Sequence, residues 1–503
     1  MGASRILGGV TATATFVMTC APAFADVTSQ QVWEDWKAYL GGFGYSVQAD
    51  EAADGGDLTV SDIVLDMPLP EAEGDLTISV PEVSFTDNGN GTVSVSFPSP
   101  LPILIQGSGK EGSGAVTLDY TTTGYSMVVS GDVDAMTYVY EADTMAVTLE
   151  DVMEDGEMAE VGDARFELTD VSGQSEMRVG DLRQATQEFT SGPISYMLDF
   201  EDPENGDRMQ MNGEAESLSV TAETAMPPAT DMSDLNAALA AGFAVDAEYA
   251  FGPGNTSIDV DQKSGGEAFK ATTTSNGGTL SVAMDESQLG YGIAYQGLEM
   301  EMASSDLPFP VELAFEQLGL DLMMPVSQSE EPQNFKLDLL LADFTMSDFI
   351  WGMFDPQGTL PRDPATVAVD LSGQATLNTD LMDPEAMVSA DIPGEVNEVA
   401  LNDLRVSFAG AELTGSGDVE LDNSDMSSYD GMPKPVGTVN LALEGGNALL
   451  DKLVSLGLVP EEQAMGARMM MGMFAVPSGE DNLTSTIEFT EEGQILANGQ
   501  RLK

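Results

Sequence analysis

The 503-residue chain carries 85 acidic residues against 17 lysines and arginines, a formal net charge of −68. So negative a surface is repelled by nucleic-acid phosphates and anionic lipid head groups, which excludes DNA and RNA as partners and indicates adaptation to a saline medium. With 42% hydrophobic residues the chain is too apolar for a disordered acidic protein, and it is longer than a usual single core, so two or more subdomains or one elongated sheet are expected.

Residues 1–25 have the features of a cleavable secretory signal. Arg5 supplies the positive start, residues 6–18 form a modestly apolar core, and Ala23-Phe24-Ala25 gives the small-x-small pattern that a signal peptidase needs. A lipoprotein signal with Cys20 as the lipidated residue is the alternative, but the expected small residue does not precede it. We therefore expect cleavage after Ala25 and export to the periplasm of a Gram-negative bacterium.

Cysteine and histidine are nearly absent. Cys20 is the only cysteine and the chain has no histidine, so the mature protein has neither. Disulfides, Ser-His-Asp or Cys-His nucleophiles, His or Cys zinc sites and haem ligated by either residue are therefore excluded. We expect no enzyme activity, with a carboxylate-based hydrolase as the remaining alternative.

The first element after the signal is predicted to be a helix over residues 28–43. Thr28 and Gln31 have the spacing of a capping box. One helical face is apolar and is broadened by Trp33; it consists of Val32, Trp36, Tyr39, Leu40 and Phe43. We expect the helix to close one end of a sheet, with a lid over a groove as the alternative.

Strand-like alternation dominates the rest of the chain. Apolar and polar residues alternate over residues 57–67, 75–85, 91–97, 114–151, 166–173, 194–200, 216–223, 278–304, 335–346, 366–381 and 398–423. Turn signals recur roughly every 8–12 residues, which is typical of antiparallel meanders. One side of each run is apolar and the other is acidic or hydroxylic, which indicates one dry and one wet face. The predicted fold class is mainly β (a β-rich α+β protein), with long curved antiparallel sheets of meander hairpins and a few capping or separating helices.

Further helices are predicted over residues 231–245, 346–354, 446–459 and 460–476. They divide the chain after the signal into an N-terminal helix plus β region (26–230), a middle helix plus β region (231–345) and a C-terminal β region with two Met-rich helices (346–503). Ser233-Asp234 and Ser347-Asp348 open two of these helices in the same way, which raises the hypothesis of a duplication.

Two candidate motifs have simpler explanations. Residues 101–114 superficially suggest a phosphate loop, but Leu104 and Glu111 stand where Gly and Ser or Thr are required. The turns at 87–90 and 199–207 are rich in the oxygen ligands that calcium prefers, without the twelve-residue loop spacing. We expect a hairpin loop, ordinary acidic turns and no cofactor, with calcium as the alternative.

Methionine, with 30 copies, is the least ordinary apolar residue of the chain. Met469, Met470, Met471 and Met473 fall on the last predicted helix, where flexible side chains suit core filling, a groove for apolar partners or copper binding through thioethers. The residues predicted to line an apolar groove are Trp33, Trp36, Tyr39, Met469, Met470 and Met473. No catalytic, cofactor-binding or metal-binding residue is predicted.

The C-terminal third resembles a known family. The resemblance lies in LRVSFAGAELTGSGDVEL (404–421), KPVGTVNLALEGGNALLDKLVSLGLV (434–459) and STIEFTEEGQILANGQRL (485–502), and WEDWKAYLGGFGYSV (33–47) is similar to the same family's start. The family is the set of secreted alphaproteobacterial proteins with domain of unknown function 2125 (DUF2125). It implies an envelope-exported, β-rich protein of unknown activity and no active-site residues.

A looser resemblance links AELTGSGDVEL (411–421) to AsmA-like envelope proteins. In these, a helix precedes long curved sheets whose concave apolar face is thought to contact lipid. The cleavable signal departs from their retained anchor helix.

The expected function is that of an exported, non-enzymatic periplasmic protein whose curved sheet binds a lipid, another apolar ligand or an envelope protein. A closed core without a cavity, and an acidic envelope or surface structural protein stabilised by cations, are the alternatives. An integral membrane protein is not expected, because no apolar run is long enough.

Overall fold

The computed structural model describes residues 26–503 apart from residues 70–73, 111, 160–161, 203–204, 229–233, 264–267, 308 and 390–391. The expected signal segment, with its cleavage after Ala25, lies outside the described residues. Strand accounts for 63% of the structure and helix for 12%, which confirms the mainly β fold.

Within the described residues, 29 strands form one antiparallel sheet. The first are β1 (Ser46–Asp54), β2 (Asp57–Leu69), β3 (Gly74–Asp87), β4 (Val93–Ser96), β5 (Leu101–Gly109), β6 (Gly112–Thr123), β7 (Ser126–Asp132), β8 (Ala135–Glu154) and β9 (Glu157–Met158). Next come β10 (Gly162–Val179), β11 (Arg183–Ser191), β12 (Ile194–Glu201), β13 (Arg208–Ala215), β14 (Leu218–Met226), β15 (Ala244–Phe251), β16 (Gly254–Asp261), β17 (Phe269–Ser275) and β18 (Gly278–Met284). The last are β19 (Leu289–Ser304), β20 (Val311–Met324), β21 (Gln333–Met346), β22 (Ala365–Leu377), β23 (Gly394–Phe408), β24 (Ala411–Asp422), β25 (Lys434–Glu444), β26 (Val476–Gly479), β27 (Asn482–Phe489), β28 (Ile495–Ala497) and β29 (Gln500–Arg501).

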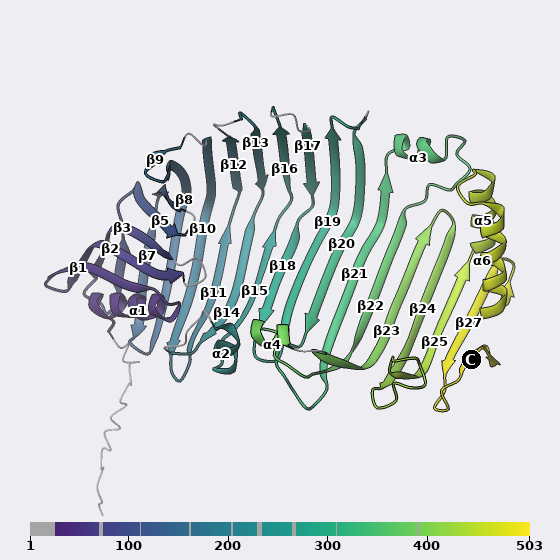
Figure 1. The fold of residues 1–503 in the computed structure, drawn as a ribbon. Coiled ribbons are helices and arrows are strands. Elements are labelled where there is room, and N and C mark those ends of the chain that lie inside the picture. Colours follow the sequence, from purple (N-terminus) through teal and green to yellow (C-terminus); the bar gives the residue numbers. More distant parts are fainter. Residues whose placement is uncertain are drawn as a thin grey trace, which may run out of the picture.

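The row of strands divides twice into two tracks. Between β3 and β8 one track is β4–β7 and the other is β5–β6. Between β10 and β19 the lower wall is β11–β14–β15–β18 and the upper wall is β12–β13–β16–β17, as oriented in Figure 1. From β19 to β27 the row is single. About 19 strands thus stand side by side, which at about 4.8 Å per strand gives a sheet roughly 85 Å long.

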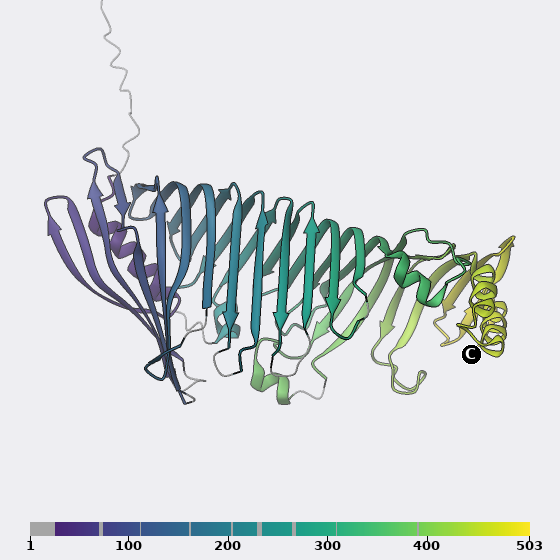
Figure 2. The same cartoon turned by 90° about the horizontal axis from the view of Figure 1, so that it is seen from above.

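The two walls meet along a crease, so that the sheet is folded along its length and has a concave side (Figure 2). Long strands cross this crease through a residue with positive φ: Asp62 in β2 (49°), Asp170 in β10 (50°), Gly297 in β19 (54°) and Asp343 in β21 (49°). Such a residue turns a strand sharply, and glycine and aspartate are among the few that tolerate the conformation.

The crease also shifts the alternation of side chains by one residue. In β10, Phe166 and Leu168 lie opposite Val147 and Met145 of β8, whereas beyond Asp170 the pairs are Val171 with Ala142 and Gly173 with Tyr140. A period-two pattern without this extra residue would place the apolar side chains of the two walls on opposite faces. With it, both walls direct their apolar side chains to the same side.

Six helices lie at the ends and edges of the described sheet (Figure 1). They are α1 (Ser29–Gly42), α2 (Leu235–Ala240), α3 (Asp348–Phe354), α4 (Pro384–Ser389), α5 (Gly446–Ser455) and α6 (Glu461–Phe474). The predicted capping box is confirmed, because the Gln31 N–H donates to Thr28 Oγ1 (3.3 Å) and the Thr28 N–H to Gln31 Oε1 (3.0 Å).

The predicted helix over 231–245 is much shorter than expected. Gly242, with a φ of 100°, follows α2, and the chain then continues as β15 because its alternating residues pair with β14 and β18. The helix α4 was not predicted from the sequence, because six residues are too few to show a helical period. The strand ladder also runs without interruption across residues 230 and 345, through the pairs β14–β15 and β21–β22.

A second small core holds α3 against the C-terminal part of the sheet. Trp351 stacks on Phe408 with ring centroids 5.9 Å apart. The carboxylate of Asp355 is fully buried and accepts hydrogen bonds from the N–H groups of Thr359 and Leu360, both at 2.8 Å. Burial opposes ionisation of Asp355, but these two donors hold its pKa below the ordinary value.

The crease makes a prediction for Asp170. Asp170→Val places a β-branched residue at positive φ and should destabilise the protein by about 1–2 kcal/mol, whereas Asp170→Gly should change the stability by less than about 0.5 kcal/mol. Urea unfolding followed by circular dichroism measures both variants. Equal stability of the two would contradict a required left-handed conformation at the crease.

Acid should weaken the α3 core. Because the folded-state pKa of Asp355 lies below the unfolded value of about 3.9, its carboxylate stabilises the fold above that pH and the contribution is lost as the pH falls through the folded pKa. Thermal unfolding of wild type and Asp355→Asn between pH 7 and pH 3 measures the effect. The wild type should melt higher at pH 7, and this advantage should begin to shrink as the pH falls below the unfolded value of about 3.9. A difference that stays constant down to pH 3 would refute the role of ionised Asp355.

Candidate functional site

The concave side of the folded sheet presents a continuous apolar surface, here called the apolar face. Side chains directly opposite each other in an antiparallel ladder lie on the same face, so the register identifies its members. On the upper wall and adjoining strands they include Phe166, Tyr196, Leu198, Phe200, Met209, Met211, Ile258, Val260, Phe269, Met300 and Met302. On the lower wall and adjoining strands they include Phe189, Val220, Tyr249, Phe251, Leu280, Val282, Tyr291, Ile293, Leu320 and Leu322.

The same face continues toward the C-terminal end. Beyond β20 it is carried by the ladder of Leu337, Leu339, Leu341, Val369, Leu371, Val399, Leu401, Leu441 and Leu443. The opposite, convex face of the same strands is polar; on β12 and β13, for example, it presents Asp199, Ser195, Gln210, Asn212 and Glu214. The strands therefore divide into an apolar side and a mainly polar side, with a few exposed apolar residues such as Met197 on the convex face.

Much of the apolar face is open to solvent between the helices at its two ends. Phe200 and Met209 on the upper wall are 38% and 36% exposed, and Tyr249 on the lower wall is 40% exposed. Tyr291 and Leu322, on β19 and β20, are similarly exposed. A soluble monomer seldom leaves so extended an apolar patch uncovered without using it for binding.

The helix α1 covers the apolar face at its N-terminal end. Trp33 is 1% exposed, and the ring of Phe85 on β3 lies 6.1 Å from Trp33 and 5.3 Å from Trp36. The Trp33 indole N–H donates to Glu51 Oε1 at 2.6 Å, which satisfies the one polar atom of a buried ring. The helix therefore closes this end of the sheet.

A buried polar cluster fixes α1 in place. Asp35 forms an ion pair with Arg183 at the start of β11, and the Tyr138 hydroxyl on β8 donates to Asp35 Oδ2 at 2.7 Å. The side chains of Asp35 and Arg183 are only 5% and 12% exposed. Burial and the neighbouring Asp35 carboxylate raise the pKa of Tyr138, so its hydroxyl stays protonated and remains a donor.

The structure separates the residues predicted to line a groove into two groups. Trp33, Trp36 and Tyr39 lie on α1 and pack against the N-terminal core. Met469, Met470 and Met473 lie exposed on α6, at the opposite end of the sheet (Figure 1). The two groups do not meet, and the central part of the apolar face was not predicted as a lining. Its signal was present in the sequence, as the apolar residue at every second position of each strand.

Both edges of the concave side are acidic, but they differ in their content of lysine and arginine. We define the acidic rim as the described connections along the lower edge, residues 285–288, 325–332, 378–389, 392–393, 423–433 and 490–494. These connections contain no lysine or arginine. Their described acids include Asp285, Glu286, Glu330, Glu331, Asp380, Asp425, Asp430, Glu491 and Glu492. The upper-edge connections are also acidic, with Asp207, Asp306, Asp363, Glu461 and Glu462 among their residues, but they include the cations Lys263, Arg362, Lys452 and Arg468.

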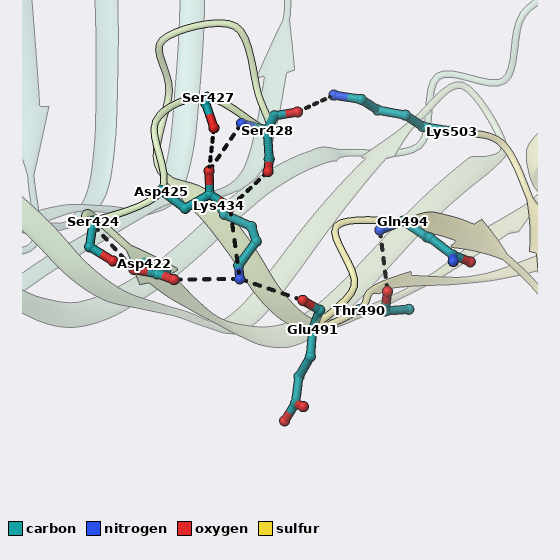
Figure 3. Close-up of polar contacts among 10 residues, drawn as sticks. All are labelled: Asp422, Ser424, Asp425, Ser427, Ser428, Lys434, Thr490, Glu491, Gln494 and Lys503. Carbon is teal, nitrogen blue, oxygen red and sulfur yellow. Dashed lines mark hydrogen bonds and ion pairs between the residues drawn. The ribbon is translucent and has the colours of Figure 1, made fainter.

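Lys434, the first residue of β25, is enclosed by the acidic rim (Figure 3). Its Nζ lies 3.4 Å from Asp422 Oδ2 and 4.0 Å from Asp425 Oδ2, and donates to the Glu491 carbonyl oxygen at 3.4 Å. Its side chain is only 18% exposed. This ammonium group is therefore already engaged within the protein.

Serine donors keep the carboxylates around Lys434 ionised (Figure 3). The hydroxyl and N–H of Ser424 hold the pKa of Asp422 below its ordinary value, and Lys434 adds to the effect. The hydroxyl and N–H of Ser428 do the same for Asp425, with Ser427 and Lys434 contributing. The rim is consequently negative at neutral pH.

The turns that raised the question of calcium use their oxygens internally. Asp87 Oδ1 accepts from the Gly89 N–H (2.8 Å), and Asn90 Oδ1 accepts from the Thr92 hydroxyl (2.7 Å). In the second turn both carboxylate oxygens of Asp199 accept hydrogen bonds from the guanidinium of Arg208. Across the described residues, no group of three or more acids is placed to hold a metal ion.

The structure also shows what the suspected phosphate loop forms and whether any described helix could span a membrane. Residues 101–109 and 112–123 are β5 and β6, which pair down to Gly109 opposite Gly112, so the suspected phosphate loop is a hairpin, as predicted. Among the described residues, no helix is both long and apolar enough to cross a bilayer.

The buried ion pair of α1 makes a prediction. Arg183→Met leaves the Asp35 carboxylate buried without its cation and should destabilise the packing of α1 by about 3–5 kcal/mol, whereas Asp35→Leu combined with Arg183→Met should cost less. Trp33 and Trp36 report the change through tryptophan fluorescence during urea unfolding.

The matched control is Arg178→Met. Arg178 forms an exposed ion pair with Glu176, two residues earlier on β10, so its loss should cost at most about 1 kcal/mol. A loss for Arg183→Met no larger than the loss for Arg178→Met would contradict the proposed anchoring of α1.

Comparison with known proteins places the chain in a family without assigning it an activity. No curated protein and no solved structure matches it. The model of one family matches residues 193–499, which begin with the residue before β12 and extend through both walls to the C-terminal strands. The match covers more than half of the chain and includes most of the open apolar face. The chain therefore belongs to DUF2125, a family of uncharacterised proteins conserved in bacteria.

Proposed function

We propose that this protein is an exported, non-enzymatic protein that binds the acyl chains of a lipid or a similar amphiphile on its apolar face. The observation that carries the proposal is the apolar face itself. It runs from β10 to β25 with mainly apolar side chains at alternate positions, and its aromatic residues Phe200, Tyr249 and Tyr291 are 38%, 40% and 41% exposed.

The chemistry of this face favours a flexible apolar ligand. The positions named above contain neither carboxylates nor cations, so no charged group fixes the orientation of a rigid ligand; the polar groups of the face are a few hydroxyls, such as those of Tyr196 and Thr256, which bond to each other. Acyl chains need only apolar contact. Binding them would remove the surface of the acyl chain and the matching part of the apolar face from water, which is favourable by about 25 cal/mol per Å² of apolar surface buried. Phenylalanine, tyrosine, leucine and methionine side chains adapt to such chains without a preformed pocket.

The remaining features agree with a carrier or scaffold outside the cytoplasm. Residues 1–25, with Arg5 and the Ala23-Phe24-Ala25 triplet, support export to the periplasm. The absence of cysteine after residue 20 suits an oxidising compartment in which a free thiol would react. The absence of histidine and cysteine from the mature chain also argues for binding rather than for nucleophilic catalysis.

Lipid binding is tested by paired substitutions on the two faces of the sheet. Phe200→Asn with Tyr291→Asn removes two half-exposed aromatic side chains from the apolar face, and should weaken binding of a fluorescent diacylglycerol by about tenfold, which is about 1.4 kcal/mol. Binding is measured as fluorescence enhancement on titrating the full mature chain.

The control substitutes apolar residues of similar exposure on the convex face. Val139 and Met197 are 50% and 40% exposed, and each neighbours an apolar-face residue on its own strand. Val139→Asn with Met197→Asn should leave binding unchanged. An equal loss in both pairs, or no binding by the wild type, would overturn the proposed function.

A further inference from the structure

The charge of the acidic rim bears on which amphiphile the apolar face accepts. A lipid whose acyl chains lie on the apolar face must leave its polar head group in water, at an edge of the concave side. The lower edge is bordered by the connections of the acidic rim, which contain no lysine or arginine. A head group there meets an array of carboxylates.

The two ammonium groups beside the rim do not offset this charge for a ligand. Lys434 is enclosed by Asp422, Asp425 and the Glu491 carbonyl group. The ammonium of Lys503 donates to the Ser428 carbonyl oxygen (2.9 Å) and lies 4.0 Å from the centre of the Tyr429 ring. Both ammonium groups are already paired, so neither is presented to an anionic head group.

The rim acids, in contrast, are presented to solvent. Glu286 and Glu330, Glu331, Glu491 and Glu492 are all exposed. Their field reaches about one Debye length, about 8 Å at physiological ionic strength, which is the scale of a lipid head group. Complementary charge favours the matching ligand, and juxtaposed like charge disfavours the other.

We propose that the acidic rim makes the apolar face selective for lipids whose head group carries an ammonium group, and disfavours anionic lipids with the same acyl chains. This inference rests on the proposed lipid binding and specifies its substrate class. The acyl chains supply affinity on the apolar face, and the rim supplies discrimination between head groups.

The test uses four dioleoyl lipids that differ only in the head group. Phosphatidylethanolamine, a trimethylammonium lipid, uncharged diacylglycerol and anionic phosphatidylglycerol compete for the full mature chain against a fluorescent diacylglycerol. At 20 mM sodium chloride the two ammonium lipids should displace the probe at concentrations at least fivefold lower than phosphatidylglycerol. The selectivity ratio is the concentration of phosphatidylglycerol divided by the concentration of ammonium lipid that displaces the same amount of probe. At 500 mM sodium chloride this ratio should approach one, because salt screens the charges of the rim.

A rim variant separates the role of these carboxylates from the net charge of the protein. Glu286→Gln, Glu330→Gln, Glu331→Gln, Glu491→Gln and Glu492→Gln together should bring the ratio at low salt close to one and leave diacylglycerol binding unchanged. The control removes the same number of charges from the convex face, through Glu299→Gln, Glu301→Gln, Glu312→Gln, Glu398→Gln and Glu420→Gln. It should keep the ratio of the wild type.

The outcomes distinguish the two proposals. If the wild type binds diacylglycerol but takes phosphatidylglycerol as well as or better than phosphatidylethanolamine at low salt, the head-group inference is wrong and lipid binding stands. The inference also fails if the control variant loses selectivity as fully as the rim variant. If no dioleoyl lipid displaces the probe and the probe itself does not bind, the proposed function fails.

Discussion

The whole architecture depends on keeping apolar side chains on one side of a sheet that turns a sharp corner. A period-two strand that bent without compensation would present its apolar residues to opposite sides of the two walls. The extra residue at positive φ, such as Asp62, Asp170 or Asp343, restores the match. At the N-terminal end the result is a shared core: Leu58 and Val60 precede Asp62, Ile63 and Leu65 follow it, and all four are buried in one cluster under α1. Farther along, the same device yields an apolar face whose centre is not covered by any element of the described residues.

Local signals predicted the strands, α1 with its capping box, and the one-sided character of the sheet. They could not predict the crease, although its trace is visible: in "FELTDVSG" the apolar spacing changes from Phe166 and Leu168 to Val171 across Asp170. A single shifted position is indistinguishable from an ordinary bulge until neighbouring strands are seen to shift together. The ion pair of Asp35 could not be predicted from the sequence either, because Arg183 is 148 residues away along the chain and only the folded sheet brings the two together. The groove residues were sought on the helices, among tryptophans and clustered methionines, whereas the open surface lies on the strands and is built from leucine, valine, methionine, phenylalanine and tyrosine at regular spacing.

Negative charge on the convex face has a physical role that follows from the uncovered apolar face. Asp321, Asp338, Asp370 and Asp403 lie directly opposite one another on four successive strands, an arrangement that destabilises a sheet through like-charge repulsion. Lys336, 3.1 Å from Asp321, and the amide of Asn402, 3.0 Å from Asp370, relieve it only in part. A long apolar face exposed to water would otherwise favour association between copies. Strong charge of one sign opposes that association at long range and leaves uncharged or cationic amphiphiles free to approach.

The dimensions of the apolar face explain why a binding function left no motif. A specific pocket requires a few convergent polar groups, and such groups give a sequence recognisable spacings. The apolar face, about 12 strands wide from β10 to β25, is roughly 50 Å long, far longer than one acyl chain, and offers many nearly equivalent positions instead. Selection then acts on the average property of every second residue, and no single residue is indispensable. Discrimination between ligands has to come from where the polar part of the ligand must sit, at the edge of the concave side. There the sequence is again composed of common turn residues, and it is the folding of distant connections into one edge that turns scattered aspartates and glutamates into a single acidic rim.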